Sequence, residues 1–169
     1  YSGLNALNLG ILIEDIHRWF GPMDRLLATA HTFIRQRPLD TAAGETGIVE
    51  RPDTITVSGT LKSGAAATFC FSGVAPLGTG TTIEAHGSAG SLLYNLDQQI
   101  LTGGKVGDKE LHELPIPPEW VGEWTVEHDF INAIKTGQPA ETTFTQGLQY
   151  MEFTEAVFRS VERGGMVNF

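Results

Sequence analysis

The last third of the chain, residues 127–164, reads as two helices joined by a turn, and it constrains the fold more than any other segment. The first helix has apolar residues at helical spacing and ends at Gly137. The second begins at Thr143 and Gln146, which have the spacing of a capping box, and ends at Gly164. Helices with this apolar periodicity need a surface to pack on. We therefore expect a helix pair with one buried face.

Residues 23–116 alternate between strand and turn patterns. Thr54–Leu61 alternates apolar and polar residues, and the Lys62-Ser63-Gly64 turn leads into Ala66–Ser72, which is typical of a hairpin. Further strands are expected at Met23–Ile34, Thr81–Ala85, Ser91–Asn95, Gln99–Thr102, Lys109–Leu114 and Met166–Phe169, a helix at residues 5–20, and loops at Arg35–Pro52 and Gly73–Gly80. This order predicts an α+β fold, a mostly antiparallel open sheet with helices packed on one face.

Length and composition favour a globular protein. The chain has 169 residues, which fits one domain over residues 1–169, since about 150 residues per domain is usual. Its net charge of −9 argues against partners such as nucleic acid or an anionic membrane surface. Its single cysteine, Cys70, allows no disulfide within the chain, so we expect a cytoplasmic protein with Cys70 in the core. A chain that opens on Tyr1 is expected to be a fragment.

Four pieces of the sequence, in order, resemble the C-terminal domain of the Gfo/Idh/MocA oxidoreductases. Residues 8–21, NLGILIEDIHRWFG, resemble the family pattern D-x-G-x-H-x-x-D-x-x-R-x-x-x-G through Gly10, Asp15 and Arg18. The hairpin at residues 53–72 and the H-G-S-A-G-S-L turn follow. The run D-F-x-x-A-I-x-x-G-x-P, and then G-L-x-x-x-x-x-x-E-A-V-x-x-S, completes the match.

The resemblance implies a function for a larger, two-domain protein. Family members are nicotinamide-dependent sugar and cyclitol dehydrogenases, which bind NAD or NADP mainly through an N-terminal Rossmann domain that this sequence lacks. Their C-terminal domain binds the sugar or polyol and forms a homo-oligomer through the open sheet face. By this resemblance, the isolated chain is expected to be inactive. A non-catalytic binding or regulatory relative and a purely structural dimerisation module remain alternatives.

The sequence departs from the family at two positions. Asn8 and Leu12 stand where family dehydrogenases carry a catalytic Asp and His, and leucine can neither accept nor donate a proton. Asn8, Leu12 and Asp15 lie at i, i+4 and i+7 and share one stripe of a helix. One interpretation is that this stripe lines the substrate cleft, with Asn8 and Asp15 binding hydroxyls. The other is that Leu12 is core, continuous with Ile16 and Trp19, and that Asp15 is locally paired.

The remaining candidate residues have simpler interpretations. His17, near the C-terminal end of its helix, is expected to be a surface histidine that the helix dipole stabilises. His128 and its acidic neighbours point in different directions, which disfavours a metal site. Trp120 and Trp124 could stack on a sugar ring or anchor a helix on the sheet. The glycines at 73–80 have no helix behind them, so a phosphate cradle is not expected there.

The sheet pattern also predicts association. Ile55 and Val57, with Phe69 and Phe71 on the neighbouring strand, would place apolar residues on one or both faces of the sheet. One layer of helices cannot cover both faces. We therefore expect a dimer or a higher oligomer.

Overall fold

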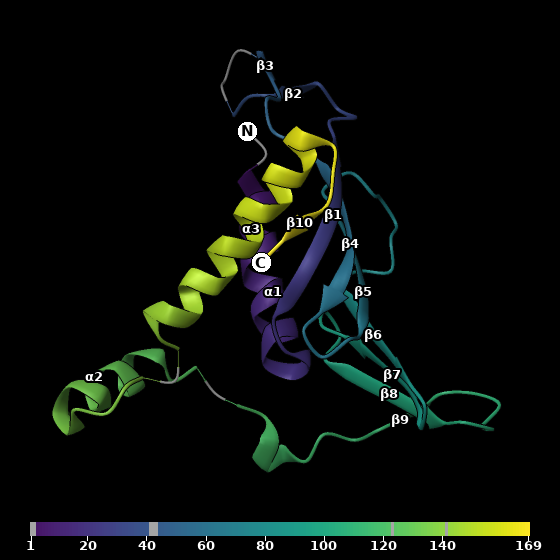
Figure 1. Ribbon diagram of the computed structural model, residues 1–169, viewed down its shortest axis with the longest axis vertical. Coiled ribbons are helices and arrows are strands. Elements are labelled where there is room, and N and C mark those ends of the chain that lie inside the picture. Colours follow the sequence, from purple (N-terminus) through teal and green to yellow (C-terminus); the bar gives the residue numbers. More distant parts are fainter. Residues whose placement is uncertain (1–2, 41–43, 123, 141) are drawn as a thin grey trace. The chain divides into compact units, whose positions relative to one another are not determined.

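The computed structural model describes residues 3–40, 44–122, 124–140 and 142–169 (Figure 1), with the side chains of the first helix described from Leu9 onward. The described chain forms two compact units, Tyr1–Ala75 with Thr136–Phe169, and Pro76–Lys135. None of the described helices has the length and apolar character needed to cross a lipid bilayer.

The first unit contains a four-stranded antiparallel sheet of order β10-β1-β4-β5, a separate two-stranded hairpin and two helices. Its elements are α1 (Gly3–Phe20), β1 (Met23–His31), β2 (Gln36–Pro38), β3 (Thr46–Ile48), β4 (Thr54–Leu61), β5 (Ala66–Ser72), α3 (Phe144–Arg163) and β10 (Val167–Asn168). The predicted hairpin has the predicted bounds in β4 and β5.

The second unit contains another four-stranded antiparallel sheet, of order β6-β7-β8-β9. Its strands are β6 (Thr82–Gly87), β7 (Gly90–Asn95), β8 (Ile100–Lys105) and β9 (His112–Glu113), followed by a 3-10 helix at Pro118–Trp120 and by α2 (Val126–Thr136). Helices together with antiparallel sheets confirm the predicted α+β class.

One face of the first sheet is covered by helices. Ile55 lies opposite Phe71, and Val57 opposite Phe69, so the apolar residues of β4 and β5 share a face. Ile55 and Val57 are fully buried there, as is Leu26 of β1. Helix α3 contacts β1, and α1 contacts β4 and β5 (Figure 1). The prediction of helices packed on one face is therefore confirmed for this sheet.

The opposite face of the same sheet carries hydroxyl groups. The register places Thr29 beside Thr56, and Ser58 beside Thr68, all of them exposed. The structure places Ile55, Val57, Phe69 and Phe71 on a single face, whereas Leu27 of β1, opposite Ser58 and 41% exposed, lies on the open face. Cys70 also lies on the open face, opposite Thr56, and is exposed. Its predicted place in the core is therefore wrong, because the strand alternation that turns its half-buried neighbours Phe69 and Phe71 toward the helices turns Cys70 outward.

Helix α3 begins and ends where the sequence predicts. The backbone amide of Gln146 donates to Thr143 Oγ1 at 3.3 Å. The backbone amide of Thr143 donates to Gln146 Oε1 at 2.7 Å, which completes the capping box. Gly164 ends the helix with a φ of 63°, a left-handed conformation that glycine adopts without strain. The buried side of α3 is formed by Phe153, Ala156, Val157 and Ser160.

Helix α2, unlike α3, has no buried side. None of its side chains is buried, and Phe130 and Ile134 are 62% and 68% exposed. The expectation of a buried face is thus correct for α3 and wrong for α2. Trp120 and Trp124 are also exposed, at 76% and 79%, so neither anchors α2 by burial. The periodicity predicts the helix correctly, but it does not report what the apolar side packs on.

The segment after β1 differs from the predicted loop. Strand β1 stops at His31 because the carboxylate of buried Asp53 accepts the next backbone amides, those of Phe33 and Ile34. The expected loop Arg35–Pro52 contains the β2–β3 hairpin.

A buried serine joins α3 to the sheet. The short strand β10 pairs with β1 only at Arg25 and Leu26, so the Ala28 amide lies beyond it. That amide donates to Ser160 Oγ at 2.9 Å, and the Ser160 hydroxyl donates to the Gly165 carbonyl at 2.7 Å. Ser160 therefore satisfies a strand amide and the C-terminal turn of α3 at once.

Replacing this hydroxyl should destabilise the fold. Ser160→Ala leaves the buried Ala28 amide without its acceptor, and we expect the free energy of unfolding to fall by about 1–3 kcal/mol. Ser58→Ala, on the exposed face, is the control and should change it by less than about 0.5 kcal/mol. Urea unfolding followed by circular dichroism measures both. Equal effects of the two variants would contradict the assigned role.

Candidate functional site

Helix α1 carries the residues that the sequence singles out. Its fully packed side consists of Leu9, Ile13 and Ile16, at i, i+4 and i+7, and the helix contacts α3 as well as strands β4 and β5. The predicted stripe of Asn8, Leu12 and Asp15 is displaced from this side by one residue. One residue is about 100° around a helix, so the stripe flanks the buried side rather than forming it.

Two of the three predicted residues can be placed. Leu12 and Asp15 are both half-buried, whereas the side chain of Asn8 lies outside the described residues. In the alternative interpretation, Leu12 is a core residue and forms one continuous buried surface with Ile16 and Trp19. Ile16 is buried, but Trp19 is 51% exposed. A half-buried stripe leaves part of each side chain open to a ligand, and the substrate-binding role of these residues stays a prediction.

The half-buried carboxyl group of Asp15 has an altered proton affinity. Burial raises its pKa above the usual value, the neighbouring Glu14 carboxylate raises it further, and Arg18 opposes both effects. The oxygens of this carboxylate can accept hydrogen bonds from the hydroxyl groups of a ligand.

A polar cluster that the sequence analysis missed lies beside this stripe. Arg18 Nη2 contacts Glu14 Oε1 at 2.7 Å, and also Thr142 Oγ1, just before α3, at 2.8 Å. Burial, followed by the Glu14 carboxylate, raises the pKa of the Tyr150 hydroxyl. The i, i+4 spacing of Glu14 and Arg18 could have indicated their pair. Nothing in the sequence indicates the contact to Thr142, which is 124 residues away from Arg18.

His17 is not the protonated surface residue that the sequence predicts. It is half-buried, its ring meets Phe153 edge-on at 6.3 Å, and burial lowers the pKa of its imidazole. Neither ring nitrogen has a hydrogen-bond partner among the described residues. The prediction considered only the dipole of α1, whereas packing against α3 removes the ring nitrogens from water.

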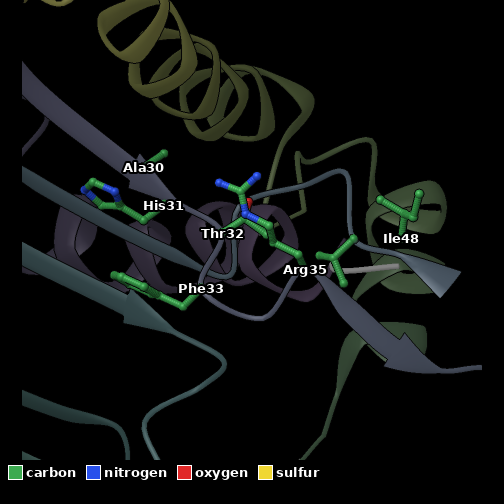
Figure 2. Close-up of a pocket in the computed structure, with 7 residues that line it drawn as sticks. Ala30, His31, Thr32, Phe33, Arg35 and Ile48 are labelled. Atoms are coloured by element: carbon green, nitrogen blue, oxygen red, sulfur yellow. The ribbon is translucent and has the colours of Figure 1, made fainter. Parts of the chain in front are cut away.

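A cavity of about 520 Å³ lies where β1 ends, and the sequence analysis missed it as well. Figure 2 shows His31, Phe33 and Arg35, from the end of β1 and the turn after it, together with Ile48 of β3. Nearby Asp53 is 1% exposed. Burial alone would raise the pKa of its carboxyl group, but the backbone amides of Ile34 and Phe33, helped by Thr54 and Arg37, hold that pKa below its usual value.

The other titratable candidates lie on the surface. His86, His112 and His128 are exposed. His86 Nδ1 lies 2.9 Å from Ser91 Oγ across the β6–β7 pair. Among the described residues, no three His, Cys, Asp or Glu side chains are grouped so that they could hold a metal ion.

The sequence profile of the Gfo/Idh/MocA oxidoreductase family, C-terminal alpha/beta domain, matches residues 8–169. The chain belongs to this family. A comparison with curated proteins finds no match.

Solved structures share the fold. Levoglucosan dehydrogenase in complex with NADH and L-sorbose matches with a TM-score of 0.79 and 22% identity, over 95% of this chain and 49% of that one. An NAD binding oxidoreductase from Klebsiella pneumoniae gives a TM-score of 0.78, 21% identity and coverages of 95% and 49%. The transcriptional regulator Gal80p from Kluyveromyces lactis gives a TM-score of 0.71 and 21% identity, over 95% of this chain and 44% of that one. The chain spans about half the length of these proteins.

The described residues do not fit a dinucleotide by themselves. A pyrophosphate cradle needs a glycine turn that leads from a strand into the N-terminus of a helix. The glycine-containing segment at residues 73–80 leads instead into strand β6, and the glycine turn at 87–90 joins β6 to β7. No described glycine turn connects a strand to a following helix, so no catalytic step can be assigned through such a cofactor here.

The burial of His17 predicts a pH dependence of stability. Because the folded-state pKa lies below the ordinary value of 6.5, the unfolded chain binds this proton more readily. The stabilisation is complete above about pH 6.5 and is lost as the pH falls through the folded-state pKa. His17→Leu should therefore flatten the decline in unfolding free energy between about pH 7 and pH 5, as urea titrations would measure.

His128→Leu provides the matched control for this prediction, since the His128 side chain is 82% exposed. It should leave the pH dependence unchanged. An unchanged slope in His17→Leu, with the same fold by circular dichroism, would show that His17 titrates normally in the folded chain.

Proposed function

We propose that residues 1–169 form the substrate-binding and oligomerising C-terminal domain of a two-domain, NAD(P)-dependent sugar or cyclitol oxidoreductase. The observation that carries this proposal is membership of the oxidoreductase family over residues 8–169. It is supported by the fold shared with levoglucosan dehydrogenase, whose structure contains NADH and L-sorbose. The missing dinucleotide cradle is consistent with a cofactor bound mainly by another domain.

In this proposal, the α1 stripe contacts the sugar or polyol. The amide of Asn8 can donate to one hydroxyl and accept from another. Asp15 is half-buried, and its carboxylate can accept a hydrogen bond from another hydroxyl. Leu12 supplies an apolar surface for the C–H face of a ring. Neither Asn8 nor Leu12 can accept the proton of the oxidised alcohol, so that proton must leave through another group.

A second candidate function follows from the same stripe. A regulatory relative that binds a sugar without transforming it would need hydroxyl-binding groups but no proton relay, and Asn8 and Leu12 fit that description. The fold is also shared by the transcriptional regulator Gal80p. This observation favours a binding role as the runner-up.

The proposal also includes the cellular location of the protein and its oligomeric state. A single, exposed cysteine is consistent with a cytoplasmic protein. The open face of the β10-β1-β4-β5 sheet is the surface that we assign to contacts between copies of the chain. Among the described residues, neither α1 nor α3 occupies this face, because both pack on the opposite one.

A double substitution tests the enzymatic proposal. In a protein that carries both domains, Asn8→Asp with Leu12→His should restore the proton path of the family and raise the rate of polyol oxidation by about 10²–10⁴-fold. NAD(P)H absorbance measures the rate, and the 169-residue chain alone should show no turnover. Leu12→Gln with Asn8→Asp is the control, because glutamine is polar but transfers no proton at neutral pH.

The outcomes of this experiment separate the two candidate functions. A stable double variant with no gain in rate, combined with sugar binding by the parent, would favour the regulatory role. Enzyme-like turnover by the isolated chain would contradict the proposed division of labour between two domains. Thermal unfolding of each variant controls for damage to α1, where Leu12 is only half-buried.

The assembly can be tested by light scattering. At micromolar concentration the chain should have the mass of a dimer or a higher oligomer, and Thr56→Arg on the open face should shift it to the monomer by steric and charge repulsion. Thr145→Arg, at an exposed position of α3, is the control and should leave the mass unchanged. A strict monomer in the parent chain would contradict this part of the proposal.

A further inference from the structure

The cavity at the end of β1 is separate from the α1 stripe. Its lining comes from the last residues of β1, from the turn that follows and from the end of β3, including His31, Phe33, Arg35 and Ile48 (Figure 2). Neither Leu12 nor Asp15 is among the described residues that line it. The cavity measures about 520 Å³, which is the size of a small-molecule site.

The rim of the cavity is held in place by hydrogen bonds of its backbone amides and carbonyls, two of them to the carboxylate of buried Asp53. The Asp53 carboxylate accepts the amides of Phe33 and Ile34 at 2.9 and 2.8 Å, and the Asp53 amide donates to the His31 carbonyl at 3.0 Å. On the other side, the Val49 amide donates to the Arg35 carbonyl at 2.9 Å. A ligand would therefore bind to a preformed rim and would not have to order it.

The lining combines an apolar platform with positive charge. The rings of His31 and Phe33 stack at 5.5 Å with 24° between their planes, and Phe33 and Ile48 are 66% and 74% exposed. The Arg35 guanidinium has no hydrogen-bond or ion-pair partner among the described residues, and Figure 2 shows its side chain extending back toward the end of β1. No carboxylate lines the cavity in the part of the chain that the structure describes.

We propose that this cavity binds a small ring compound that carries a carboxylate or a phosphate. The planar guanidinium of Arg35 offers paired donors that match either anion. The stacked rings of His31 and Phe33, with Ile48 opposite, offer the apolar surface on which the ring of the ligand rests. The carboxylate of buried Asp53, next to the rim, accepts two backbone amides, and no ion pair joins it to Arg35 among the described residues.

Binding by the 169-residue chain tests the proposal directly. The probes are benzoate, phenyl phosphate and glucose 6-phosphate, compared with benzyl alcohol, which lacks the charge, and with inorganic phosphate, which lacks the ring. Isothermal titration should show the charged ring compounds binding at least about tenfold more tightly than either comparison compound, and more weakly at high salt. The two aromatic probes distinguish carboxylate from phosphate, and glucose 6-phosphate tests a saturated ring.

Two variants locate the site. Arg35→Gln should weaken binding of the preferred probe by about tenfold or more, and Phe33→Ser should weaken it severalfold. Arg25→Gln removes an equal charge from the other end of β1 and should leave binding unchanged. Both Arg35 and Phe33 are exposed, so the variants should fold, as thermal unfolding would verify. No measurable binding of any charged ring compound, or equal losses in Arg35→Gln and Arg25→Gln, would overturn the proposal.

Discussion

The packing of Phe153 is the contact on which the first unit depends. Its side chain is fully buried on α3, meets the ring of His17 on α1 at 6.3 Å and meets the ring of Phe69 on β5 at 5.8 Å, both edge-on. One side chain thus joins the two helices to each other and to the sheet. Such edge-to-face contacts add to the free energy of burial, and a helix layer held in this way fixes the rotation of α1 about its axis. That rotation decides which stripe of α1 is half-open.

Local signals in the sequence were sufficient for much of the fold. The capping box of Thr143 and Gln146, the left-handed Gly164 and the hairpin turn at residues 62–64 depend on residues a few positions apart, and all three appear as predicted. Alternation also identified which residues within β4 and within β5 point the same way, whereas only the register of the two strands shows that their apolar sides share a face. These features were predictable because each is determined by backbone geometry within one or two turns of chain.

Features that depend on distant residues were not predictable in this way. The burial of His17 follows from Phe153, and the early end of β1 follows from Asp53, about 20 residues further along the chain. The candidate site likewise has some features that depend on nearby residues and others that depend on distant residues. Spacing placed Leu12 and Asp15 on one stripe, but only the packing of α1 against α3 shows that this stripe is half-buried. The cavity beside Arg35 required the β2–β3 hairpin, whose short strands lie in a segment that reads as a loop.

The chemistry of the open sheet face affects the kind of assembly that it can support. An obligate homodimer interface is usually richer in apolar surface than the rest of a protein. Here the open face presents Thr29, Thr56, Ser58 and Thr68, whose hydroxyl groups can be hydrated when no partner is present. Threonine has a high propensity for β-strands, so its presence on this face costs the strands little stability. Association through this face would therefore rely on hydrogen bonds and shape more than on apolar burial, and a chain without a partner would not expose a large apolar sheet.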